Sequence, residues 1–380
     1  MKSKECMDAL LEKEIKENRI PGAQIGVYSG EETFYEMEYG YPKDSIYRMY
    51  SMTKPVTAVA AMVMYQRGKL DLLSPVAEYL PEFGEMEVLT EAGRKSAKRQ
   101  IQIWDLLNMT SGIVYPDEDL AGREMERQIQ KVQERTDTPE AYTTRQVAEL
   151  IAKAPLAAEP GERWRYGLSA DVLGAVIECI DGRELSRFYQ EEIFEPLGME
   201  DTSFWVPREK QSRLVTLFYQ EEEGGRTILR EDESRHLGLG YGMVSPAFVS
   251  GGAGLYSTRE DYKKFARMLL KKGGLPGGNR LLSEQVFSMF VQNHLTLEQK
   301  KTVDFVHMAG YGYGSLMRIH ENPRQSGSCS GIGEFGWDGW TGPYCSVDCE
   351  RDRIFLFMTQ VSGYSDWPLI RKMKAVVNTF

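Results

Sequence analysis

The 380-residue sequence has neither a long hydrophobic run nor a block of basic residues. Its longest apolar stretch, around Val56 to Met64, is far short of the ~20 residues that a membrane-spanning helix needs. The 46 Lys and Arg are outnumbered by 56 Asp and Glu, so the formal net charge is −10, which repels phosphate backbones. We therefore expect neither a membrane span nor a nucleic-acid partner.

The sequence also lacks the paired motifs of metal and redox sites. Its 5 Cys include no C-x-x-C pair, and its 4 His show neither H-E-x-x-H nor H-x-H spacing. This excludes a recognisable metal site, and the N-terminal segment lacks the apolar core of a signal peptide. We expect a cytoplasmic protein with reduced thiols. The histidines are expected to be surface or loop residues; they are His236, His294, His307 and His320.

The secondary-structure signals run in the order strands, helices, strands. Two β-prone runs at 23–29 and 33–39 are separated by a short turn, which indicates a hairpin. Apolar residues spaced i, i+3, i+4, i+7 predict a helix over 53–67. From about 70 to 234 helical periods dominate, broken by charged loops such as 117–134, and strand signals are scarce. Later segments predict a helix at 259–270 and strands at 312–319, 345–347 and 354–359.

This order predicts an α/β (α+β) fold in which an antiparallel sheet is flanked by helices. Residues 1–75 and 238–380 would form one α/β domain from both ends of the chain. Residues 76–237 would form a mostly helical inserted domain.

The predicted helix begins with an S-x-x-K motif, Ser51-Met52-Thr53-Lys54. Residues three apart on a helix share a face, so the Lys54 amine can reach the Ser51 hydroxyl. A serine becomes a good nucleophile when a neighbouring base takes its proton, and a lysine can be that base if burial lowers its pKa. The motif alone is weak evidence, because roughly one S-x-x-K occurs by chance in a chain of this length.

Two further segments support this interpretation. Tyr166 stands just before a helical segment, and beside a cationic Lys54 its pKa would fall, giving a phenolate able to take the Ser51 proton. The glycine-punctuated turn at 335–342 leads into a predicted strand. Its backbone N–H and that of Ser51 could together form an oxyanion hole.

With these elements the chain resembles the serine β-lactamase and penicillin-binding-protein superfamily, in its class C-like branch, which includes family VIII carboxylesterases. The flanking phrases carry the resemblance as well: residues 46–54, 68–72, 106–112, 250–255 and 261–262. The resemblance implies an acyl-enzyme on Ser51, proton transfer by Lys54 and Tyr166, and an oxyanion hole from the backbone N–H groups of Ser51 and Trp340.

The substrate-binding positions depart from the penicillin-recognising pattern. Leu168 replaces the asparagine of Tyr-x-Asn, and Trp337-Asp338-Gly339 replaces Lys/His-Thr/Ser-Gly. Asp338 would repel a substrate carboxylate, and Leu168 cannot donate a hydrogen bond to a side-chain amide. Trp337 and Trp340 would form an aromatic wall for an apolar group. These departures resemble the esterase branch.

We therefore predict a serine hydrolase that cleaves a small-molecule ester or amide, above all carboxylic esters, without cofactor or metal. An acyltransferase that uses the same acyl-enzyme is the first alternative, followed by a D-amino-acid peptidase or weak β-lactamase. A non-catalytic ligand-binding relative is a further alternative. The G-x-C-x-G at 327–331 is the only trace of a nucleophile elbow, and no βαβ pattern surrounds it. The sequence leaves the oligomeric state open.

Overall fold

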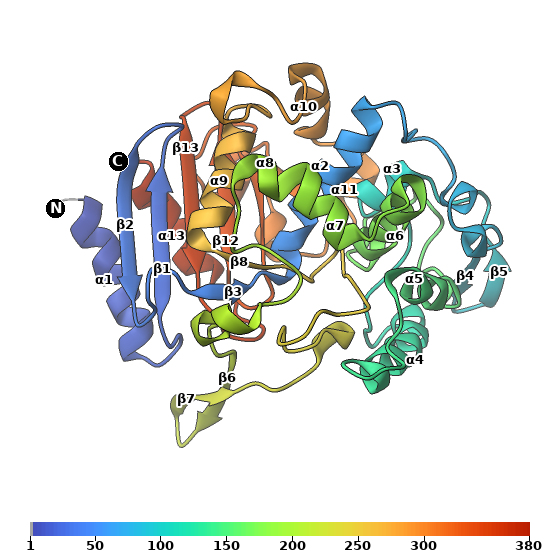
Figure 1. The fold of residues 1–380 in the computed structure, drawn as a ribbon, viewed down its shortest axis with the longest axis horizontal. Helices are drawn as coiled ribbons and strands as arrows, with labels where there is room; N and C mark the ends of the chain where they lie inside the picture. The colour runs from blue at the N-terminus through green and yellow to red at the C-terminus, as the bar shows by residue number, and fades with distance from the viewer. Residues whose placement is uncertain (1–2) are drawn as a thin grey trace.

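The computed structural model describes residues 3–380, and its centre is a seven-stranded sheet with strand order β2-β1-β13-β12-β11-β10-β9 (Figure 1). Every neighbouring pair in this sheet is antiparallel. The strands are β1 (Ala23–Tyr28), β2 (Thr33–Tyr39), β9 (Tyr311–Gly314), β10 (Met317–His320), β11 (Phe335–Asp338), β12 (Tyr344–Asp348) and β13 (Arg353–Met358). Both ends of the chain therefore build one sheet, and the predicted antiparallel sheet is confirmed.

Side chains of β13 alternate between two apolar layers, as the period of a β-strand requires. Phe355 and Phe357 pack with α1 (Ser3–Lys16) and α13 (Trp367–Val377), whereas Leu356 and Met358 face the larger core. Helix α9 (Arg259–Leu270) contacts β12 and β13 from that second side. Figure 1 shows α9 in front of the sheet and α13 behind it, so the sheet is covered on both faces.

Helix α2 (Thr53–Gln66) is the central element of the larger core. Every residue from Thr53 to Met64 is buried, which fits a helix that is apolar nearly all round. The predicted helix at 53–67 is confirmed within one residue at its C-terminal end. A buried helix gives its first turn a fixed position, and this turn carries Lys54.

The other helices lie mainly to one side of the sheet (Figure 1). They are α3 (Ile103–Leu107), α4 (Leu120–Arg135), α5 (Thr144–Ala152), α6 (Ser169–Asp181), α7 (Leu185–Tyr189), α8 (Glu195–Leu197), α10 (Glu284–Phe290), α11 (Leu297–Lys300) and α12 (Pro323–Ser326). The predicted charged loop at 117–134 is wrong, because most of it forms α4. Asp119 caps this helix by accepting from the Gly122 N–H, and Met125, Ile129 and Val132 form its buried stripe.

The strands differ from the prediction in two respects. The single run at 312–319 is a tight hairpin, β9–β10, in which Ser315 and Leu316 take positive φ values of 48° and 61°. Leu316 N–H donates to the Leu107 carbonyl, so contacts with α3 hold a turn that neither residue favours by itself. The middle of the chain also holds two small hairpins that were not predicted: β4 (Glu87–Thr90) with β5 (Gly93–Ser96), and β6 (Phe218–Glu223) with β7 (Arg226–Glu231).

The predicted division into residues 1–75 plus 238–380 and residues 76–237 stays a prediction. Across residues 3–380, none of the helices combines the length and apolar character that crossing a membrane requires.

Candidate active site

Ser51 lies where a short strand passes into the buried helix α2. Strand β3 (Ile46–Arg48) pairs with β8 (Tyr256–Thr258), and one 3-10 turn, Tyr50–Met52, joins β3 to α2. Tyr50 takes a positive φ of 44° in this turn, a conformation uncommon outside glycine and concentrated at functional sites. The turn leaves Ser51 partly exposed on a cavity of about 560 Å³, the Ser51 cavity.

Lys54 is fully buried beneath Ser51 and has three hydrogen-bond partners. Its Nζ lies 3.0 Å from Ser51 Oγ, 2.9 Å from the Tyr115 hydroxyl and 2.9 Å from the Gly252 carbonyl oxygen. Three acceptors match the three N–H bonds of an ammonium group. The amine is therefore aimed at the serine hydroxyl by contacts from three different segments.

Burial gives Lys54 an unusual acidity for a lysine. Removal from water lowers its pKa to about 8, while the carboxylates of Asp171 and Asp338 act in the opposite direction. Asp171 accepts hydrogen bonds from Ser250 Oγ at 2.5 Å and from the Gly252 N–H at 3.1 Å. A lysine with this pKa exchanges its proton near neutral pH, as a catalytic base must.

Tyr166 reaches the same place from the residues preceding α6. Its hydroxyl accepts a hydrogen bond of 2.9 Å from Trp337 Nε1, and Lys54 Nζ lies 4.8 Å from the centre of its ring. The structure thus brings Ser51, Lys54 and Tyr166 together although they are spread over more than a hundred positions of the chain.

The predicted fall in the pKa of Tyr166 is wrong. Burial raises the pKa of this phenol well above its usual value, and hydrogen bonds with Ser51 and Trp337 offset only part of the rise. The physical reason is geometric: the Lys54 amine lies over the ring, where it makes a cation–π contact, and donates to a different hydroxyl. Of the two groups, Lys54 is therefore the one that exchanges a proton near neutral pH.

Tyr115 is the component that sequence reasoning missed. Its hydroxyl accepts from Lys54 Nζ, its ring lies 5.5 Å from that of Tyr166, and burial raises its pKa well above the usual value. The signal in the sequence was that Tyr115 follows three residues after Gly112, the last residue of the family-like segment 106–112. Gly112 has φ 83° and a Cβ there would lie 2.4 Å from the Ala158 carbonyl oxygen, so the chain turns sharply before Tyr115.

The predicted oxyanion donors lie on two segments that meet. Gly339 follows β11, and a Cβ at this position would be 2.5 Å from the carbonyl oxygen of Met49, so only glycine lets the two backbones approach this closely. This contact places Trp340 beside the Ser51 turn. Within residues 3–380, neither the Ser51 N–H nor the Trp340 N–H donates to another backbone carbonyl.

The wall of the Ser51 cavity is mainly aromatic. Its lining includes Tyr50, Tyr115, Tyr166, Phe305, Trp337, Trp340, Tyr364 and Trp367. Among the described residues that line it there is no Lys or Arg, and the acidic members are Glu126 and Asp338. Such a wall suits an uncharged, largely apolar substrate.

Two histidines also line this cavity, His236 and His307, and both lie in partly exposed 3-10 turns, as expected of surface or loop residues. The prediction is wrong for His320, which is buried in β10. His236 stacks on Trp340 with ring centres 3.9 Å apart, and His307 stacks on Trp367 at 3.8 Å. Burial lowers the pKa of His236 to about 4 and that of His307 to about 3. Both imidazoles are therefore neutral at pH 7.

The predicted substrate-binding residues divide into two groups. Trp337, Asp338, Gly339 and Trp340 line the Ser51 cavity, whereas Leu168 is packed in the core and does not. Asp338 is not a free charge: it accepts a hydrogen bond of 2.8 Å from Arg318, a buried guanidinium. Burial raises the pKa of Asp338 to about 6, and Arg318 opposes this rise. Trp337 is itself nearly buried, so Trp340 offers more of the accessible wall.

Over residues 3–380, no set of three or more His, Cys, Asp or Glu side chains is placed so that it could hold a metal ion. The covered antiparallel sheet has the fold of penicillin-binding-protein-like proteins, and the relatives below make the chain a serine hydrolase of this class. The chain belongs to the beta-lactamase family, whose profile matches residues 7–373.

Known relatives cover nearly the whole chain. Protein Rv1367c of Mycobacterium tuberculosis is 32% identical over 364 residues, which cover 90% of this chain and 86% of that protein. Esterase EstB of Burkholderia gladioli is 27% identical over 375 residues, covering 94% and 90%. The solved structure of EstCE1, a hydrolase with promiscuous acyltransferase activity, superposes with a TM-score of 0.81 at 22% identity and covers 99% of this chain and 98% of that one.

Proposed function

We propose that this serine hydrolase is a carboxylesterase that works through an acyl-enzyme on Ser51. The observation that carries the proposal is the buried Lys54 amine, with a pKa near 8, held 3.0 Å from a serine hydroxyl that opens on an aromatic cavity. The likeness to EstB over nearly the whole chain supports the same activity.

The reaction begins when neutral Lys54 takes the Ser51 proton as Oγ attacks the ester carbonyl carbon. The carbonyl π bond opens, and the oxyanion accepts hydrogen bonds from the backbone N–H groups of Ser51 and Trp340. The C–O bond to the alcohol then breaks, and the alcohol oxygen takes the proton held by Lys54. Tyr115, whose hydroxyl accepts from Lys54, and Tyr166, whose hydroxyl hydrogen-bonds with Ser51, act as relays to this oxygen, because burial keeps both phenols protonated.

Hydrolysis of the acyl-enzyme repeats these steps with water. Lys54 removes a proton from the attacking water, the tetrahedral adduct forms again in the same oxyanion hole, and its collapse returns the proton to Ser51 Oγ. The carboxylic acid leaves and the enzyme is restored.

Carboxylic esters fit the cavity better than penicillins do. A penicillin carries a carboxylate, and no Lys or Arg lines the cavity among its described residues. The carboxyl group of Asp338 is engaged by Arg318, and both lining histidines are neutral. A carboxylate that entered the Ser51 cavity would lose its hydration without gaining a cationic partner, which is unfavourable.

The aromatic wall also favours a second candidate, acyl transfer to an alcohol. An apolar cavity disfavours water relative to an alcohol with an apolar body, and the same acyl-enzyme serves both reactions. The ratio of transfer to hydrolysis with increasing concentrations of an added alcohol decides between them. Exclusive hydrolysis at saturating alcohol would contradict the transferase.

The test of the esterase uses p-nitrophenyl butyrate and a fluorophosphonate. We expect the wild-type protein to hydrolyse the ester and to gain the mass of one phosphonyl group on the peptide containing Ser51. Ser51→Ala should lose both properties while keeping its melting temperature, and an unrelated exposed serine, Ser96 changed to Ala, is the matched control. Equal turnover by Ser51→Ala would refute the proposal.

A further inference from the structure

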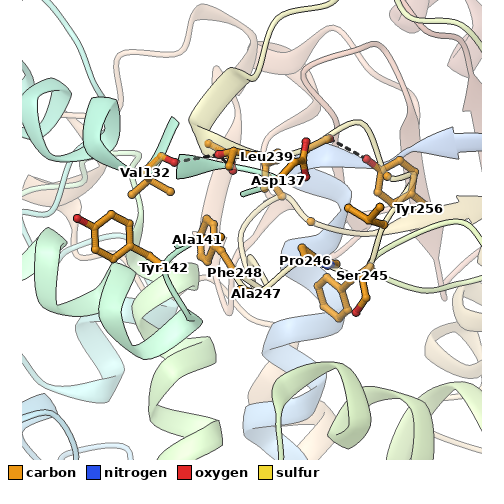
Figure 2. A pocket seen from close by; sticks show the side chains of 18 of the residues that line it. Val132, Asp137, Ala141, Tyr142, Leu239, Ser245, Pro246, Ala247, Phe248 and Tyr256 are labelled. Atoms are coloured by element: carbon orange, nitrogen blue, oxygen red, sulfur yellow. Dashed lines mark hydrogen bonds between the residues drawn. The ribbon is translucent and has the colours of Figure 1, made fainter. Parts of the chain in front are cut away.

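A second cavity of about 360 Å³ adjoins the Ser51 cavity and plays no part in the steps above. It is enclosed by the C-terminal end of α4, by residues 138–142 and by the loop at 238–248. Figure 2 shows Val132, Tyr142, Leu239 and Phe248 among the side chains that surround it. Its size lies within the range of small-molecule sites.

The two cavities share part of their lining. Tyr50 and Ala253 line both, and they are the residues next to Ser51 and next to the Lys54 acceptor Gly252. Helix α4 likewise presents Ile129 to the Ser51 cavity and Val132 to the second cavity. Tyr50 and Ala253 therefore mark the boundary between the Ser51 cavity and the second cavity.

The charged groups at the second cavity already have partners. The Arg48 guanidinium donates to the Val215 carbonyl at 2.9 Å. Asp137 packs against Gly240, where a Cβ would lie 2.4 Å from its carboxylate oxygen, and it faces Arg235 at 3.8 Å. The rest of the lining is mostly aliphatic and aromatic, so an uncharged hydrocarbon is the matching occupant.

The chemistry of ester cleavage decides which part of the substrate, the acyl group or the alcohol, points from Ser51 toward the second cavity. The alcohol oxygen must lie near the proton-carrying groups, Tyr115 and Tyr166, which pack with each other, and Tyr166 also packs with Phe305. Tyr50 packs instead with Trp340, at 5.2 Å between ring centres. Among the described residues no ring contact joins these two groups. In the tetrahedral intermediate on Ser51, the alcohol and the acyl substituent point in different directions. If the alcohol lies near Tyr115 and Tyr166, the acyl substituent lies toward Tyr50, which lines the second cavity.

We propose that the second cavity receives the acyl chain, so that the enzyme prefers esters with a medium-length apolar acyl group and a small alcohol. This inference rests on the proposed esterase function and adds the substrate class. Each methylene transferred from water into the cavity would raise kcat/KM by about fourfold.

The isomers ethyl heptanoate and heptyl acetate test this directly, because they have the same composition and place the long chain on opposite sides of the ester. The wild-type kcat/KM should favour ethyl heptanoate. Ala141→Trp, which fills the second cavity, should lower the ratio of kcat/KM for ethyl heptanoate to that for heptyl acetate by about tenfold or more. Ala247→Trp fills the same cavity from the loop and repeats the test should Ala141→Trp not fold.

Ala92→Trp is the matched control, because Ala92 is exposed in the turn between β4 and β5. It should leave the ratio unchanged. An unchanged ratio in both cavity-filling variants, or a ratio that rises because heptyl acetate suffers more, would overturn the inference. Failure of the wild-type protein to hydrolyse either isomer, together with no phosphonyl adduct on Ser51, would instead overturn the proposed function and this inference with it.

Discussion

The two ends of the Ser51 cavity are held in different ways. At one end, hydrogen bonds fix individual atoms: Lys54 Nζ has three partners at 2.9–3.0 Å, and Trp337 Nε1 holds the Tyr166 hydroxyl. At the other end, His236 lies flat on Trp340 with an interplanar angle of 13°. Hydrogen bonds specify where a proton can go, whereas stacked rings specify only a surface. We expect substitutions at the first end to change the rate of reaction and those at the second to change substrate binding.

The largest effect is expected for Lys54→Met, which keeps the apolar stem and removes the amine. Without a base for the Ser51 proton, kcat should fall by about 10³-fold or more, with a much smaller change in KM. Steady-state kinetics with p-nitrophenyl butyrate measure this. A loss confined to KM would mean that Lys54 only positions the substrate.

The same variant also reports the pKa of Lys54 through stability. A folded-state pKa near 8, below the ordinary 10.5, means that folding disfavours the ammonium, so the unfolded chain binds more protons between these values. The free energy of unfolding of the wild type, relative to Lys54→Met, should therefore rise by about 3 kcal/mol between pH 8 and pH 10.5. Urea unfolding at several pH values measures the difference, and a flat difference would place the pKa at its ordinary value.

Next in size is the contrast between the two phenols. Tyr166→Phe should lower kcat by about 10²-fold, because it removes a relay hydroxyl and leaves Trp337 Nε1 without its acceptor. Tyr115→Phe should cost about tenfold and also move the acidic limb of the pH profile to lower pH, because the ammonium form of Lys54 loses an acceptor. If Tyr115→Phe proves the more damaging change, Tyr115 and not Tyr166 is the principal proton carrier.

This contrast shows where sequence reasoning reaches its limit. Ser51 and Lys54 could be paired from helical spacing, and Tyr166 could be added through the family resemblance. No spacing rule links Tyr115 to Lys54, because the two residues lie 61 positions apart in the sequence. The chain turns at Gly112, which packs against Ala158, shortly before Tyr115. The cavity histidines were missed for a similar reason, since stacking on a distant tryptophan leaves no periodic signal in the sequence.

The elements of the fold show the same limit: those set by local sequence patterns were predicted, and those that depend on distant contacts or a weak pattern were missed. Helix α2 and the β1–β2 hairpin were predicted because local periodicity and turn residues agree with their packing. Helix α4 was mistaken for a loop because its many charges hid a narrow apolar stripe, although Asp119 is a good N-cap. The β9–β10 turn was missed because Ser315 and Leu316 adopt positive φ only through contacts with α3.

A moderate effect is expected from pH itself. Since neutral Lys54 is the proposed base, kcat/KM should rise about tenfold per pH unit below pH 8 and level off above it. Both phenols have pKa values raised by burial, so a phenolate base would instead give a limb that keeps rising beyond pH 10. Initial rates with an ester of a non-ionising alcohol, from pH 6 to pH 10.5, separate the two cases.

The smallest effects belong to the stacked end of the cavity. Trp340→Ala removes the ring and keeps the backbone N–H, so kcat should stay within about threefold while KM rises by about tenfold from lost apolar contact. His236→Phe keeps a flat ring on Trp340 and, because the imidazole is neutral down to about pH 4, should leave the pH profile above pH 5 unchanged. If kcat of either variant instead fell about a hundredfold, the end of the cavity formed by Trp340 and His236 would also take part in proton transfer. The proposed division between a reacting end and a binding end would then be wrong.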